Sequence, residues 1–130
     1  MEQTIQRKRL SDLHFENQLW LSEIEFFKLE LRSLEARLGE VVNQNTDHYL
    51  LSQADQFQNR FIIQQSSIAE LLHLIKEHEH WLAKFAKEHP VAIDKVEFAD
   101  HTILREKYVS FKKSYSNTKS EFLKNLINWM

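Results

Sequence analysis

The stretch from Leu50 to Phe85 decides the fold. It reads LLSQADQFQNRFIIQQSSIAELLHLIKEHEHWLAKF. Apolar residues return at alternating steps of four and three, which is the heptad pattern of a long helix that buries one face. We call these positions the second seam: Leu50, Ala54, Phe57, Phe61, Gln64, Ile68, Leu71, Ile75, His78, Leu82 and Phe85. Only Gln64 and His78 are polar, so the stretch predicts one uninterrupted helix that packs against other helices.

Two further seams flank this stretch. The first seam consists of Leu10, Leu13, Asn17, Trp20, Ile24, Phe27, Leu31, Leu34, Leu38 and Val41. The third consists of His101, Leu104, Tyr108, Phe111, Tyr115, Thr118 and Phe122, continued by Leu126 or Trp129. The polar segment 43–46 and the pair His89-Pro90 separate the three helices, because such residues favour turns and Pro cannot continue a helix.

The expected helices cover about 11–43, 46–88 and 100–129, with a connection at 89–99. We expect Ser11 to cap the first helix, Asn45 or Thr46 the second, and Asp100 the third. The short first turn makes the first two helices antiparallel. The sequence therefore predicts an all-α fold in one domain, 1–130: an elongated up-down-up three-helix bundle with coiled-coil-like heptad seams.

The composition supports long helices and excludes several kinds of site. The chain has 130 residues with one Gly, one Pro, no Cys and a net charge of -2. The absence of Cys excludes disulfides, thiolate zinc sites and thiol catalysis, and it favours a reducing compartment, so we expect a cytoplasmic location. Mixed charge predicts no nucleic-acid partner, and we expect the basic triplet Arg7-Lys8-Arg9 to be a solvated, frayed chain end. No apolar run approaches the roughly 20 residues that span a bilayer, so no membrane partner is expected.

Charged residues also repeat at heptad spacing beside the first and third seams. Glu16, Glu23 and Glu30 recur every seven residues on the first helix, and Arg105, Lys112 and Lys119 on the third. An up-down-up bundle makes these two helices parallel. The pattern therefore predicts that the acidic and basic rows face each other and help to set the register.

The first helix carries a second apolar line, which we call the outer stripe: Phe15, Leu19, Phe26 and Leu29. These residues lie on the face opposite the first seam. A monomeric three-helix bundle would leave them in water, and a row of exposed large apolar residues is typical of a contact surface. We therefore expect the outer stripe to be an oligomer interface or to be covered by another helical element.

Polar residues within the seams predict a buried polar layer. The hairpin geometry brings Asn17 to the level of His78, with His14 beside them, and the second connection brings Tyr108 to a similar height. One interpretation is a pocket for a small ligand or metal. The other is a hydrogen-bonded layer that fixes the register, as single polar seam residues do in coiled coils. In the second case His78 is neutral and structural.

His73, Glu77 and His80 form a second histidine group, at positions i, i+4 and i+7 of one helix. They share an outward face, and a single-helix site of this kind binds metal weakly without a further ligand. The seams contain no carboxylate, so a ferritin-like di-iron site is not expected. Phosphate loops, nucleophile elbows and His-Glu-x-x-His helices are also missing, so we expect neither a cofactor nor enzymatic activity.

Several segments resemble an uncharacterised family of small bacterial helical-bundle proteins with no known activity. They are Leu13-His14-Phe15-Glu16 with Trp20, Phe57-Gln58-Asn59-Arg60-Phe61, His78-Glu79, and His89-Pro90-Val91-Ala92-Ile93-Asp94 followed by Asp100-His101. The resemblance implies a helical bundle and no particular activity, cofactor or partner.

The sequence thus predicts a non-enzymatic helical interaction or scaffold protein. Its expected partner is a second copy of itself, in a homo-oligomer, or another helical protein. The alternative is a helical bundle that binds a metal or small ligand through its histidines.

Overall fold

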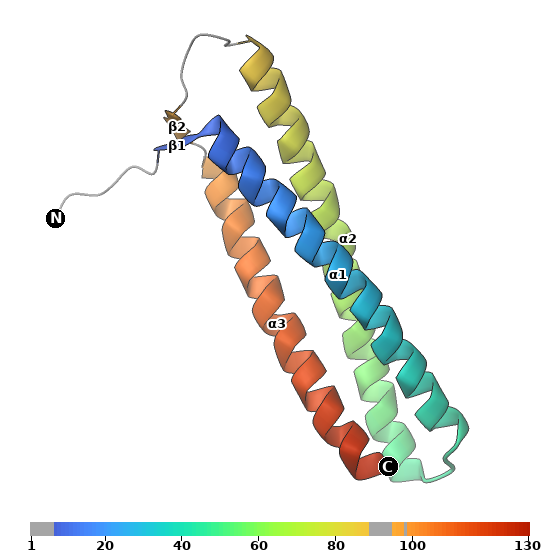
Figure 1. Ribbon diagram of the computed structural model, residues 1–130. Coiled ribbons are helices and arrows are strands. Elements are labelled where there is room, and N and C mark those ends of the chain that lie inside the picture. Colours follow the sequence, from blue (N-terminus) through green and yellow to red (C-terminus); the bar gives the residue numbers. More distant parts are fainter. Residues whose placement is uncertain (1–6, 89–94, 98) are drawn as a thin grey trace, which may run out of the picture.

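Three long helices make up the protein, for which the computed structural model describes residues 7–88, 95–97 and 99–130. These helices are α1 (Leu10–Asn43), α2 (His48–Glu88) and α3 (Ala99–Trp129). They lie along one another in an elongated bundle, in which α1 and α3 run in one direction and α2 in the other (Figure 1). The predicted all-α, up-down-up three-helix bundle is confirmed.

The core follows the three seams. Every position of the second seam from Leu50 to Leu82 is buried, including Gln64 and His78. On α3, all seven positions of the third seam from His101 to Phe122 are buried as well. Burying a large apolar side chain contributes about 1.5–3 kcal/mol, so these continuous seams supply most of the driving force for the bundle.

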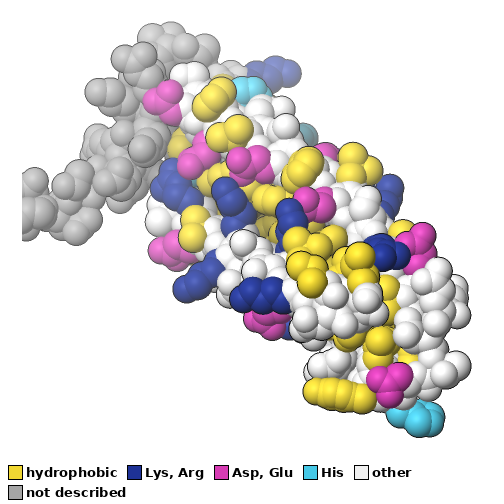
Figure 2. Space-filling model, turned by 60° about the horizontal axis from the view of Figure 1, so that its bottom comes forward, with side chains coloured by type: hydrophobic (Ala, Val, Ile, Leu, Met, Phe, Trp, Pro, Cys, Tyr) yellow, Lys and Arg dark blue, Asp and Glu magenta, His cyan; other side chains and the backbone are white. Residues whose placement is uncertain are grey.

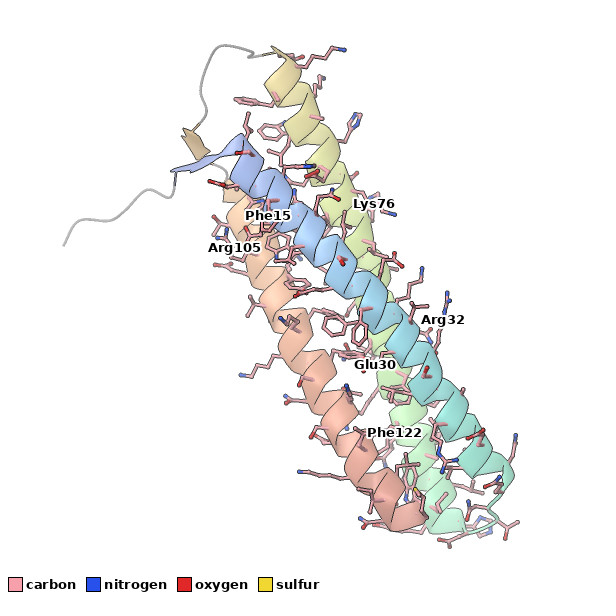
Figure 3. All side chains as sticks on the ribbon, viewed as in Figure 1. Phe15, Glu30, Arg32, Lys76, Arg105 and Phe122 are labelled. Carbon is pink, nitrogen blue, oxygen red and sulfur yellow. The ribbon has the colours of Figure 1, made fainter. Side chains whose placement is uncertain are left out.

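Aromatic rings fill the space between α1 and α3 and between α2 and α3. Near the first turn, Phe122 packs against Phe57 and Phe61 with ring centroids 5.6 and 5.1 Å apart, and Figure 3 shows its ring between the helices. At the opposite end, Trp20 stacks on the imidazole of His101 at 5.1 Å and on the ring of Tyr108 at 5.4 Å. The bundle is therefore held by aromatic clusters near both ends.

The first turn contains its own capping groups. The Asp47 carboxylate accepts a hydrogen bond from the Leu50 backbone N–H at 3.4 Å, so Asp47 caps α2. The prediction of Asn45 or Thr46 as this cap was wrong. Asn45 instead donates its side-chain amide to the Val41 carbonyl at 2.7 Å and satisfies the end of α1.

At the other end of the bundle, β1 (Arg7–Arg9) pairs antiparallel with β2 (Lys95–Glu97). The predicted fraying of the chain at the basic triplet was therefore wrong, because its backbone forms a ladder with a segment almost 90 residues away in the sequence. The rest of the predicted connection before Ala99 lies outside the described residues. Ser11 and Asp100, the other expected caps, lie inside the first turns of α1 and α3.

The predicted acidic and basic rows do face each other across α1 and α3. Carboxylate oxygens of Glu16 and Glu30 lie 2.6 Å and 2.7 Å from nitrogens of Arg105 and Lys119, respectively. The intervening pair, Glu23 and Lys112, is 3.8 Å apart. This prediction is confirmed, and the three pairs fix how α1 and α3 are placed along their length.

Two tyrosines add a second donor to these pairs. The Tyr108 hydroxyl donates to Glu23, and the Tyr115 hydroxyl donates to Glu30 at 2.8 Å. Burial, and then the hydrogen bond to the carboxylate, raises the pKa of both phenols. Each phenol therefore remains a hydrogen-bond donor throughout the physiological pH range.

Among the described residues, no helix has the length and apolar content that crossing a membrane requires.

Candidate functional site

The outer stripe is exposed to solvent. The side chains of Phe15, Leu19, Phe26 and Leu29 keep 67, 47, 58 and 58 % of their surface accessible. They project from the face of α1 that points away from α2 and α3, because the first seam on the opposite face fills the core. The structure thus leaves a row of large apolar side chains on a single helix without an intramolecular contact that buries it.

Two serines complete this row. Ser22 and Ser33 are exposed and continue the alternation of four and three through 15, 19, 22, 26, 29 and 33. Beside its first half, a groove of about 260 Å³ lies between α1 and α3, lined by Asp12, Leu13, Phe15, Glu16, Leu19 and Arg105. Figure 2 shows hydrophobic side chains gathered in a band on one face of the bundle, with charged side chains on both sides.

A chain of hydrogen bonds crosses the bundle near the β1–β2 end and joins all three helices. Nε2 of His78 on α2 lies 3.0 Å from Nδ1 of His101 on α3. Nε2 of His101 lies 2.7 Å from the carboxylate of Glu16 on α1. Arg105 then donates to both oxygens of the same carboxylate, at 2.6 and 3.0 Å.

The carboxylate sets the direction of these hydrogen bonds. Because it accepts only, His101 donates its Nε2–H to Glu16. When both imidazoles are neutral, Nδ1 of His101 accepts, so His78 donates its Nε2–H. Burial raises the pKa of Glu16, but the hydrogen bonds from Arg105 and His101 outweigh it, and the net pKa lies below its ordinary value of 4.5. Glu16 is therefore ionised at neutral pH.

His78 has the opposite preference, for its uncharged form. Burial lowers its pKa below the ordinary value of 6.5, and the neighbouring His101 lowers it further. The carboxylates of Asp100 and Glu79 oppose this effect but do not reverse it. His78 is consequently neutral at pH 7, which agrees with the structural interpretation of the predicted polar layer.

A second polar group lies on the other side of His78, around Glu79 of α2. Its carboxylate accepts from the Asn17 amide at 3.1 Å and from the His14 ring at 2.5 Å. Gln18 makes a longer contact of 3.4 Å. Asn17 is fully buried, whereas the His14 side chain is 60 % exposed. This group ties α1 to α2 from the buried Asn17 out to the exposed His14.

The predicted layer of His14, Asn17, His78 and Tyr108 is therefore divided into three parts. Asn17 and His14 bond to Glu79, His78 bonds to His101, and Tyr108 bonds to Glu23. Sequence reasoning missed the partners that organise the layer. One signal could have found His101, since it lies one heptad before Tyr108 in the third seam, beside the basic row.

The histidine group on the outer face of α2 makes one contact of its own. Nε2 of His73 lies 3.3 Å from the Glu77 carboxylate, and both side chains are well exposed. Over 7–88, 95–97 and 99–130, no three His, Cys, Asp or Glu residues are arranged so that they could hold a metal ion. His80 is exposed and lies on the same helix.

A shallow groove between α2 and α3 is the remaining feature near the polar layer. It has a volume of about 310 Å³ and is lined by Leu74, Glu77, His78, Trp81, Asp100, Ile103, Leu104 and Lys107. The indole of Trp81 stacks on the His78 ring with centroids 6.1 Å apart. The imidazole forms part of the wall of this groove, while its Nε2 is engaged by His101.

Comparison of the chain with protein-family models, with curated proteins and with solved structures finds no match.

Proposed function

We propose that this chain is a non-enzymatic helical interaction or scaffold protein that self-associates through the outer stripe of α1. The observation that carries the proposal is the exposure of four large apolar side chains, between 47 and 67 %, at heptad positions of one helix. Monomeric proteins rarely keep such a row in water, whereas a second helix placed along it would bury all four.

The buried polar groups support a non-enzymatic role. His78, His101 and Glu16 are hydrogen-bonded to one another or to Arg105 and hold the three helices together. Groups with this role fix the register of a bundle. The chain contains no Cys, which favours a reducing compartment. We therefore propose a cytoplasmic location.

Sedimentation velocity of wild type and of the double variant Phe15→Glu/Phe26→Glu tests the proposal. We expect wild type to sediment as an oligomer at tens of micromolar, and the variant as a monomer, because a buried unpaired carboxylate at each position is strongly unfavourable. The matched control is Ile63→Glu/Ile103→Glu. These residues are 60 and 51 % exposed on α2 and α3, and the two changes add the same charge away from the stripe.

The control has to remain oligomeric, and circular dichroism has to show that both variants stay helical. A wild type that is monomeric at tens of micromolar would overturn the proposal, as would a control variant that dissociates equally.

The second candidate, a metal- or small-ligand-binding bundle, rests on the groove beside His78 and Trp81. Elemental analysis of the purified protein and a thermal-shift screen with zinc, iron and nickel test it. Stoichiometric metal, or stabilisation that His78→Leu abolishes, would favour this candidate over self-association.

A further inference from the structure

We infer that the outer stripe binds a second copy of this chain with the two α1 helices antiparallel, related by a two-fold axis level with Ile24. The inference rests on the proposed self-association and adds its geometry. In such a dimer each contact occurs twice, because a two-fold axis exchanges the two copies.

The sizes of the side chains along the stripe carry this arrangement. With the axis level with Ile24, Phe26 lies opposite Ser22 of the second copy, and Phe15 lies opposite Ser33. Leu19 then faces Leu29. Every layer therefore combines a large residue with a small one, or two residues of intermediate size, and antiparallel helices pack best when facing layers have similar total volume.

A parallel dimer would distribute the same residues less well. Each residue would face its own copy, so Phe26 would meet Phe26 while Ser22 met Ser22, with alternating crowded and empty layers. In the antiparallel arrangement, heptad geometry places Gln18 beside Arg32 of the second copy and Glu25 beside Glu25.

The acidic row forms the other edge of the stripe, where an antiparallel dimer brings Glu23 towards Glu23 of the second copy. Such a contact would repel if these carboxylates were free. Each carboxylate is already paired within its own chain, Glu16 with Arg105, Glu23 with Tyr108 and Lys112, and Glu30 with Tyr115 and Lys119. The intramolecular pairs therefore neutralise the edge at which the two copies meet.

The groove between α1 and α3 fits the same arrangement. It runs beside Leu19, and in the antiparallel dimer Leu29 of the second copy lies over that position. The four stripe side chains would contribute roughly 400 Å² per protomer, about half of a standard interface. Contacts of this size are typically weak and reversible, so the dimer has to be sought at tens of micromolar protein.

Cross-linking through single introduced cysteines tests the orientation, since the chain has none of its own. Gln18→Cys protein is mixed with Arg32→Cys protein carrying a tag that changes its mass, and a short bismaleimide is added. The two sites are neighbours in the antiparallel dimer but about 21 Å apart in a parallel one. The Ser33→Cys variant alone detects a parallel dimer. The introduced cysteines of the two protomers meet in a parallel dimer and are about 27 Å apart in the antiparallel one.

We expect the mixed Gln18→Cys and Arg32→Cys sample to give the heterodimer band and Ser33→Cys to stay uncross-linked. Ser66→Cys, on an exposed position of α2, controls for random collision and has to stay monomeric. A Ser33→Cys dimer without the mixed product would overturn the antiparallel geometry. If neither cross-link forms, but wild type is an oligomer and the Phe15→Glu/Phe26→Glu variant is a monomer, the antiparallel geometry fails and the proposed function stands. If wild type is monomeric, both fail.

Discussion

Replacing His78 with Leu separates the structural role of the buried histidine from any role in ligand binding. The imidazole is buried on α2, donates its Nε2–H to Nδ1 of His101, and stacks on Trp81. Leu has a similar volume and suits the second seam. At pH 7.5 the variant loses the hydrogen bond to the buried Nδ1 of His101, which costs about 1–3 kcal/mol, and gains apolar burial of comparable size. We therefore expect its free energy of unfolding to lie within about 1 kcal/mol of wild type at that pH.

The difference appears on acidification. Burial lowers the folded-state pKa of His78 below the unfolded value of 6.5, so the unfolded chain binds the proton more readily. The contribution of the neutral imidazole is therefore complete above about pH 6.5 and declines as the pH falls below it. If the folded imidazole stays neutral down to pH 5, wild type loses about 2 kcal/mol more than the variant between pH 7.5 and pH 5, and this value is an upper limit.

Urea unfolding followed by circular dichroism at pH 7.5 and pH 5 measures this difference. His73→Leu is the matched control, since His73 lies on the exposed face of the same helix and should leave the acid sensitivity of wild type in place. If wild type loses no more stability than His78→Leu on acidification, the assignment of a neutral buried His78 is wrong. If the variant unfolds like wild type at both pH values but no longer binds a ligand found in the screen, His78 belongs to a binding site.

Three further predictions concern stability. Gly39→Ala should stabilise the protein by about 0.5–1 kcal/mol and raise the Tm by a few degrees in a thermal scan, because Gly39 is helical and an added Cβ meets nothing within 4 Å. Phe122→Ala should lower the free energy of unfolding, measured by urea denaturation, by about 3–5 kcal/mol, since the ring is fully buried. Glu16→Gln should cost about 1–2 kcal/mol at pH 7 in the same assay, a value reduced for the partial exposure of this group. Because the folded pKa of Glu16 is depressed, that cost should be present above about pH 4.5 and disappear as the pH falls through the folded pKa.

The fold could be predicted because each seam is a local signal. A residue such as Ile75 or Phe61 is buried no matter which helix packs against it. Its burial therefore follows from the period of the sequence, without knowledge of the partner. The acidic and basic rows were predictable for a related reason. Their seven-residue spacing keeps Glu16, Glu23 and Glu30 on one edge of α1 over the whole contact.

The partners within the polar layer could not be predicted because they depend on the height of α3 relative to α2. That height is set by the connection before Ala99, whose length in residues does not fix its path. An error of two helical turns, about 11 Å, replaces His101 with Tyr108 opposite His78. The β1–β2 pair has a similar cause, since two three-residue strands far apart in the sequence carry no periodic pattern.

α1 has two apolar faces, and its sequence determines which of them turns inward. The first seam is apolar at nine of ten positions from Leu10 to Val41, whereas the outer stripe has four large apolar residues, so burying the seam removes more apolar surface from water. The charge pairs act in the same direction. Rotating α1 by about half a turn would bury the stripe but carry Glu16 and the rest of the acidic row away from Arg105 and the other basic residues of α3. The burial of apolar surface and the charge pairs between α1 and α3 therefore both favour the observed orientation of α1. The outer stripe stays exposed because burying the first seam stabilises the bundle more. An apolar face that loses this competition is the surface from which a second helix gains most by binding.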